Sequence, residues 1–233
     1  MPEGPWIESK VWRAGVVVPG RRLWALLPPK LVAIRPAEVT LPPTGQTTVR
    51  ARFDSPVSIG ALRFSELILE AQVSWANFNQ SSFASHWYWI SYGILASPGR
   101  VRLPWRSRWV HAAAKPVAFT IGGAADSFTP SSDFSWRGLP FAANYEVRLD
   151  CDHGVLAEPL SLGGIELAPG TAVESDPDDP SVLEATLAGP ISVFGHHLPA
   201  GTLVVVHRGD SPQAVTVITP TGCSVIQPDG TRD

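Results

Sequence analysis

The chain has 233 residues, of which 44% are hydrophobic and 17% are charged. That composition is apolar enough to build a core and excludes a disordered chain, and the length suits one large all-β domain or two smaller ones. The 23 prolines and 20 glycines are scattered singly, as in proteins of many short strands and tight turns.

The start of the chain lacks the features of an export signal. It reads MPEGPWIESK, which is polar and carries Pro2 and Pro5 where a secretory signal is apolar. The apolar stretch at 23–34 is interrupted by prolines and a lysine, and it is shorter than the roughly 20 residues of a membrane-spanning helix. We therefore expect a protein that is made in the cytosol without a signal peptide and has no membrane partner.

Charge and aromatic content divide the chain. Residues 1–140 hold 15 Lys and Arg against 8 Asp and Glu, whereas residues 141–233 hold 3 against 13. All nine tryptophans lie in the first part, the last being Trp136. This asymmetry predicts two domains, a basic, Trp-rich one at 1–150 and an acidic one at 151–233.

Strand patterns begin early in the chain. Short β-branched segments between Pro and Gly predict strands at 14–18, 31–34, 38–41 and 47–53. Residues 66–75 alternate between apolar and polar positions, which favours a half-buried strand over the competing helix from about Ser58.

The next segments carry the candidate interaction residues. Residues 86–95 are apolar on both faces, as in a central strand or one buried at a subunit contact, and Trp87 and Trp89 share a face. Residues 100–109 alternate strictly, so as a single strand they would form a cationic row opposite an apolar row. The cationic row is Arg100, Arg102, Arg106 and Arg108, and the apolar row is Val101, Leu103, Trp105 and Trp109.

These residues have functional and structural interpretations. The arginines could contact an acidic protein surface or, as a less favoured partner, nucleic-acid phosphates. Alternatively they are the solvated charges of an edge strand, which Pro104 suits. The tryptophans at 87, 89, 105 and 109 could form a ligand platform or belong to the core.

The remaining segments complete an all-β prediction. Strands are expected at 115–123 and 144–150, with a long loop at 128–141 between them. Residues 164–193 and 195–225 form an internal repeat, and each copy reads as three short strands separated by turns. We therefore predict an antiparallel sandwich-like or barrel-like N-terminal domain and a smaller β domain whose two repeated hairpin units form pseudo-symmetric halves.

No catalytic, cofactor or metal motif stands out. Standard nucleophile, nucleotide-binding and zinc signatures are absent from the sequence. Cys151 with His153, and the acidic run at 176–179, lack the spacing of zinc or calcium sites. The tripeptide Arg208-Gly209-Asp210 matches an integrin-recognition sequence, but its composition is also that of a hairpin tip.

Three functional interpretations remain. The favoured one is a non-enzymatic structural or assembly protein, such as a phage virion component, that binds itself or other structural proteins as a homo-oligomer. The second is a carbohydrate-binding or ligand-binding module. The third is an enzyme whose site is assembled from scattered residues such as Glu70, His86, Asp150 and His153.

Overall fold

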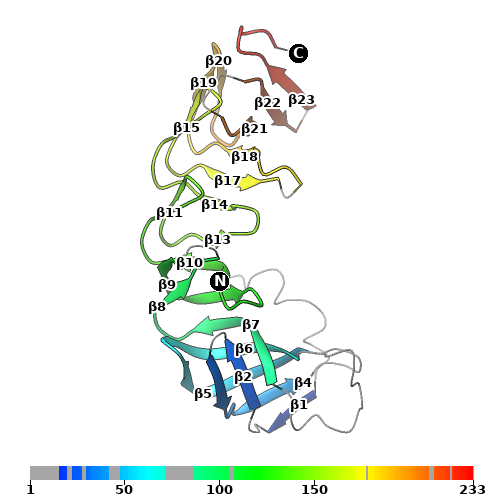
Figure 1. The fold of residues 1–233 in the computed structure, drawn as a ribbon. Coiled ribbons are helices and arrows are strands. Elements are labelled where there is room, and N and C mark those ends of the chain that lie inside the picture. Colours follow the sequence, from blue (N-terminus) through cyan, green and yellow to red (C-terminus); the bar gives the residue numbers. More distant parts are fainter. Residues whose placement is uncertain are drawn as a thin grey trace. The chain divides into compact units, whose positions relative to one another are not determined.

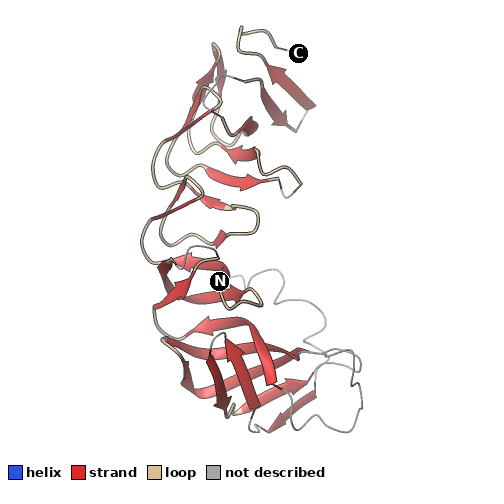
Figure 2. Ribbon diagram, viewed as in Figure 1, coloured by secondary structure: helices blue, strands red, loops and turns tan. Residues whose placement is uncertain are grey.

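The protein is all-β. The computed structural model describes residues 16–19, 23–27, 30–41, 48–71, 87–104, 108–176, 178–209, 213–220 and 222–232. Those residues form strands and turns without any helix, and hence without a helix that could span a membrane (Figure 2). Their strands pair antiparallel except at one parallel junction, so the predicted antiparallel all-β class is confirmed.

The chain divides into two compact units, Met1–Asp126 and Ser127–Asp233. The division falls earlier than the 150/151 boundary that the charge pattern suggested, because residues 127–150 pair with the segment just after them. Phe141 forms a β-bridge with Leu156, and Arg148 forms one with His153. The charge asymmetry nevertheless matches the units: the first holds 14 Lys and Arg against 7 Asp and Glu, and the second holds 4 against 14.

The first unit is built on one sheet in the order β1-β4-β5-β6-β7-β9 (Figure 1). The β2–β3 hairpin joins it through the parallel pairing of β2 with β7, and β8 pairs with β9. The strands are β1 (Val16–Pro19), β2 (Leu23–Leu27), β3 (Lys30–Ile34), β4 (Glu38–Leu41), β5 (Thr48–Ile59), β6 (Leu62–Ala71), β7 (Trp87–Leu95), β8 (Gly99–Arg102) and β9 (Trp109–Phe119).

Strand β6 confirms one prediction and corrects its detail. Of the alternating segment at 66–75, residues 66–71 form a strand and not a helix, with Leu67 and Leu69 fully buried, and residues 72–75 lie outside the described part of the chain. Its other face is buried too: Ile68 packs with Tyr92 of β7. Glu66 is 8% exposed and accepts hydrogen bonds from the Nε atoms of two β5 arginines at 2.5 and 3.1 Å. The sheet is therefore covered on both faces here. The sequence did not predict this, because the polar Glu66 indicated a solvated face.

The second unit contains one meandering sheet, three small hairpins and the antiparallel pair of β10 with β13, of which β10 starts at the end of the first unit. The sheet order is β14-β17-β18-β21-β22-β23, and the hairpins are β11–β12, β15–β16 and β19–β20. The strand bounds are β10 (Ala125–Pro130), β11 (Phe134–Trp136), β12 (Leu139–Phe141), β13 (Val147–Arg148), β14 (Gly154–Val155), β15 (Leu160–Leu162), β16 (Ile165–Leu167), β17 (Ala172–Ser175), β18 (Val182–Thr186), β19 (Ile191–Val193), β20 (His196–Leu198), β21 (Leu203–His207), β22 (Val215–Thr219) and β23 (Gly222–Ile226).

Three hairpins of the second unit share one kind of turn, so the hairpin unit occurs once more than the two sequence copies at 164–193 and 195–225. Each hairpin turns through two residues with positive φ, the second of which is glycine: Arg137-Gly138, Gly163-Gly164 and Phe194-Gly195. Such pairs favour two-residue turns that match strand twist. The first of these hairpins lies in residues 128–141, so the predicted long loop there is wrong. The predicted strand at 144–150 is reduced to Val147–Arg148.

The copies also share their connecting turns. The amide of Gly170 donates to Leu156 O, that of Gly201 donates to Leu187 O, and that of Asn144 donates to Pro130 O, all at 2.8 Å. Because β18 of one copy pairs directly with β21 of the next, the copies succeed one another in one sheet. The predicted sandwich-like or barrel-like arrangement of the two copies is not confirmed by this pairing.

Candidate interaction surface

The segment predicted as a cationic strand is a hairpin. Strand β8 ends at Arg102 and pairs with the start of β9, so that Arg102 lies opposite Trp109 and Arg100 opposite His111. The turn is closed by the amide of Leu103, which donates to Arg108 O at 2.8 Å. Residues 100–109 alternate on both sides of the turn, so the pattern alone did not reveal the reversal.

The reversal places aromatic and cationic side chains on one face. Directly paired residues of an antiparallel ladder share a face, so Trp109 joins Arg100 and Arg102, against the prediction that it lies opposite them. Val101 and Leu103 are each 1% exposed and do form the apolar face. We call Arg100, Arg102, Trp109 and His111 the hairpin face.

Local contacts position the arginine side chains of the hairpin face. The Arg100 guanidinium lies 5.8 Å from the centroid of the Trp109 ring, a cation–π distance. Arg102 Nη2 donates to the carbonyl oxygen of Gly122 in the turn after β9. Trp109 is still 50% exposed, and Ile121 beside this turn is 74% exposed. A half-exposed indole framed by arginines suits carboxylate-bearing or aromatic partners.

The other predicted interaction residues are placed differently. Trp105 and Arg106 lie outside the described residues, and Arg108 is exposed just before β9. Trp89 is half-buried on β7, whereas the side chain of Trp87 lies outside the described part of the chain. Among the members of the predicted set whose side chains the structure describes, Arg100, Arg102 and Trp109 lie together on one face.

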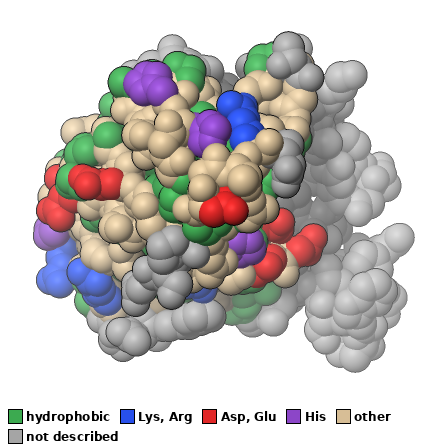
Figure 3. All heavy atoms as spheres, turned by 90° about the horizontal axis from the view of Figure 1, so that it is seen from above, with side chains coloured by type: hydrophobic (Ala, Val, Ile, Leu, Met, Phe, Trp, Pro, Cys, Tyr) green, Lys and Arg blue, Asp and Glu red, His purple; other side chains and the backbone are tan. Residues whose placement is uncertain are grey.

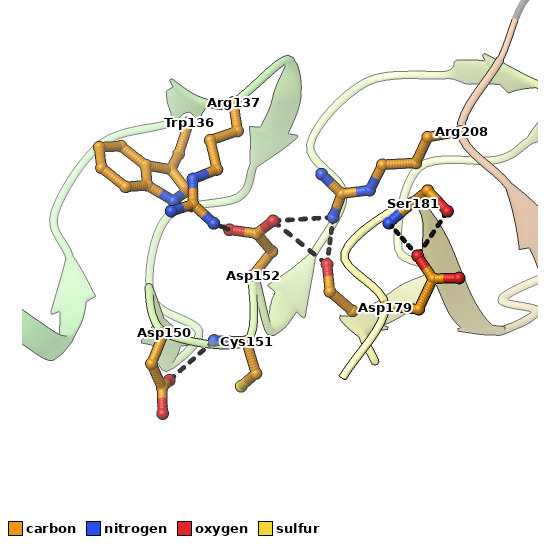
Figure 4. A network of polar contacts seen from close by, with 9 residues as sticks. Trp136, Arg137, Asp150, Cys151, Asp152, Asp179, Ser181 and Arg208 are labelled. Atoms are coloured by element: carbon orange, nitrogen blue, oxygen red, sulfur yellow. Dashed lines mark hydrogen bonds and ion pairs between the residues drawn. The ribbon is translucent and has the colours of Figure 1, made fainter. Parts of the chain in front are cut away.

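A buried carboxylate forms the densest polar cluster of the second unit (Figure 4). Asp152 is fully buried and accepts four hydrogen bonds. Its Oδ1 accepts from Trp136 Nε1 at 3.0 Å and Arg137 Nη1 at 3.3 Å. Its Oδ2 accepts from Ser175 Oγ at 3.1 Å and Arg208 Nη2 at 2.8 Å. These donors come from the first hairpin, from β17 and from the end of β21, so one side chain links three copies of the repeat.

This cluster stabilises the fold and is not arranged to receive a ligand. A carboxylate offers about four lone-pair positions, and all of those on Asp152 are occupied. Arg208 is also committed here, with a side chain only 19% exposed. The arginine of the Arg-Gly-Asp sequence therefore points into the fold instead of outward from a loop tip. Sequence reasoning missed the cluster because the partners of Asp152 lie 15 to 56 residues away.

The remaining candidate chemistry is also accounted for by local contacts. Cys151 is buried, and burial followed by the Asp150 hydrogen bond raises the pKa of its thiol to about 12, so it stays protonated. His153 Nδ1 lies 3.3 Å from Glu174. Within the described residues, no three His, Cys, Asp or Glu side chains form a group that could hold a metal ion.

Of the residues named in the enzyme hypothesis, Glu70 is exposed in the first unit, while Asp150 and His153 belong to the second. His86 lies outside the described residues.

Comparison with known proteins returned no match at the level of a family model, a curated protein or a solved structure.

Proposed function

We propose that this protein is a non-enzymatic assembly protein whose subunits bind one another through oppositely charged surfaces. One observation carries the proposal: the two structural units have opposite net charges, +7 for residues 1–126 and −10 for residues 127–233. Opposite charge on two parts of one chain steers the basic part of one copy toward the acidic part of another. Such contacts also specify orientation, because like-charged surfaces repel.

The hairpin face is the surface of the basic unit that we propose makes this contact. Tryptophan and arginine are over-represented among residues that dominate protein–protein binding energy. Here Trp109 and Arg100 are exposed on a strand pair whose inner face is anchored by Val101 and Leu103. The successive hairpin units of the second unit offer similar surfaces more than once.

We propose that the assembly is a phage virion, in which the protein is a capsid-decorating, head–tail or tail component. This step is an association by class, because many non-enzymatic β-proteins serve there.

Sedimentation velocity at about 0.1 M and about 1 M salt tests the general proposal, because the Debye length falls from ~10 to ~3 Å over that range. Assembly that loosens at high salt is expected; a monomer at both salt concentrations would refute it.

A ligand-binding module is the second candidate, favoured by the exposure of Trp109. An indole held by a neighbouring arginine is a flat platform that could stack on a sugar ring. Titrating glycans while following tryptophan fluorescence separates the two candidates: a saturable change that Trp109→Ala abolishes supports this second function, and no change leaves assembly as the better account.

A further inference from the structure

The outward face of the second unit's sheet carries an unusual pattern. Its inward residues, such as Val204, Val206 and Val217, are buried beneath the sheet. On an antiparallel sheet with one solvated face, the outward residues are ordinarily polar. Here neighbouring strands instead present Leu203, Val205, Ile218 and Val225 on the outward side. Leu203 pairs directly with Ile218, while Thr216 lies between Val205 and Val225, so these aliphatic side chains cluster around one threonine. A cluster of aliphatic side chains on an outward face is a feature of binding surfaces.

Glutamates border this patch on the neighbouring strands. Glu174 of β17 is directly opposite Glu184 of β18, and Glu184 is directly opposite Val205 of β21. Like charges directly opposite each other destabilise a sheet. We call Glu184, Leu203, Val205 and Ile218 the sheet face. In Figure 3, carboxylates and hydrophobic side chains lie side by side on the visible surface.

The two glutamates differ in their partners. Glu174 lies 3.8 Å from Arg148 Nη1 and 3.3 Å from His153 Nδ1. In the part of the chain that the structure describes, no cation lies within ion-pair distance of Glu184. An exposed carboxylate that repels its neighbour and borders an apolar patch lacks a cationic partner, so an arginine beside an aromatic group would complement it.

We propose that the sheet face of one copy binds the hairpin face of a second copy of this chain. The proposal rests on the assembly function above and names its two surfaces. Arg100 and Arg102 approach Glu184, while Trp109 and Ile121 cover Leu203, Val205 and Ile218. Each surface has what the other lacks: the hairpin face has cations around an exposed indole, and the sheet face has a carboxylate beside the exposed Ile218 and two half-buried aliphatic side chains.

The proposed contact is head-to-tail because the two surfaces differ. Heterologous contacts close into a ring when the rotation allows it and otherwise extend into a filament. A twofold dimer would instead join identical patches. The proposal therefore predicts that two variants, each damaged at a different surface, can still join, since one keeps an intact hairpin face and the other keeps an intact sheet face.

Two charge-reversal variants of the full chain provide the test. The first carries Arg100→Glu and Arg102→Glu, and the second carries Glu184→Arg. Matched controls reverse an exposed charge elsewhere in each unit, Arg35→Glu at the end of β3 and Glu166→Arg in β16. Because like-charge juxtaposition costs several kcal/mol at an interface, each test variant should weaken self-association at least roughly tenfold. The controls should match the wild type, and circular dichroism checks that every variant is folded.

Mixing the two test variants in equal amounts gives the deciding result. Light scattering should show each variant alone as a monomer and the mixture as a 1:1 complex or larger. If the wild type assembles but the test variants assemble equally well, these surfaces are wrong and the assembly function stands. If each variant is monomeric and the mixture stays monomeric too, the head-to-tail pairing is wrong. If the wild type itself never assembles, the proposed function fails with it.

Discussion

The first unit contains long strands, with 12 residues in β5, 10 in β6, 9 in β7 and 11 in β9, whereas strands β11 to β23 of the second unit have two to five residues. The first unit also pairs distant segments, as where Trp24 lies opposite Trp87 in parallel. In the second unit most strands pair with near neighbours in the chain, through turns that recur in each copy.

The two units therefore differ in what determines which strands pair. In the first unit, burial on both faces selects the pairing, as at Ile68 and Glu66 of β6. In the second, turn residues with positive φ fix each hairpin locally, and the Asp152 cluster ties the copies together. Substitutions confined to one unit should therefore expose different weaknesses.

The largest expected effect comes from Asp152→Ala. It leaves two arginines without their buried counter-charge, and breaking a buried ion pair costs about 3–5 kcal/mol. Hydrogen exchange read by mass spectrometry should show the loss in peptides of the second unit, with the first unchanged. Asp178→Ala, at an exposed position, is the control. A loss below about 0.5 kcal/mol, the usual range for surface sites, would contradict the structural role of the cluster.

A glycine in each unit tests packing directly. A Cβ at Gly93 would lie 2.5 Å from the Phe64 ring, and one at Gly154 would lie 2.5 Å from the Phe141 ring. Each Gly→Ala change should cost about 1–3 kcal/mol by overpacking, lowering protection in its own unit only.

Gly189→Ala is the matched control for this pair. No atom of the described structure lies within 4 Å of its Cβ position. Urea unfolding should show it neutral or stabilising by up to ~1 kcal/mol. If Gly93→Ala and Gly154→Ala behaved like this control, the close packing of both glycines would be refuted.

A smaller effect is expected at a repeated turn. Gly201 has φ +79° and open space around its Cβ position, so Gly201→Ala changes the backbone energy alone. The left-handed region costs a non-glycine residue roughly 1–2 kcal/mol. Urea unfolding of the second unit should register that loss, and a neutral result would show that this turn does not need glycine.

The smallest expected change is a single titration. The hydroxyl and amide of Ser181 donate to Asp179 and hold the pKa of that carboxyl below its ordinary value of 3.8. A depressed folded-state pKa adds stability above the ordinary value, and that stability is lost as pH falls through the folded pKa. Ser181→Ala should raise the pKa of Asp179 toward 3.8 in an NMR titration and leave Asp229 unchanged; an unmoved Asp179 would contradict the assigned cause.

Local pattern predicted much of the fold. The strand at 38–41 matches β4, and the two ranges of the repeat hold β16 to β19 and β20 to β23, one strand more in each than the three expected. Local pattern could not predict pairing between distant segments. The parallel pairing of β2 with β7 is an example, because alternation within each strand does not specify its partner. The third repeat copy escaped notice since Phe134 and Trp136 occupy positions held by Leu160 and Leu162 in the next copy.

The candidate surface was predicted in part. The alternating pattern correctly predicted that Val101 and Leu103 are buried and that Arg100 and Arg102 lie on the outward face. It placed Trp109 wrongly because it assumed one continuous strand, and the turn after Arg102 changes which face the later residues occupy. The sheet face was not predicted at all, because an outward residue such as Ile218 looks like core until its neighbours are known.

The central claim is that oppositely charged units drive self-association, and the molar mass of the wild-type protein tests it most directly. Light scattering over a concentration series at about 0.1 M salt should give a mass that rises above the 25.0 kDa of one chain. At about 1 M salt the mass should return toward that of the monomer. A mass of 25.0 kDa at every concentration and at both salt levels would contradict the account.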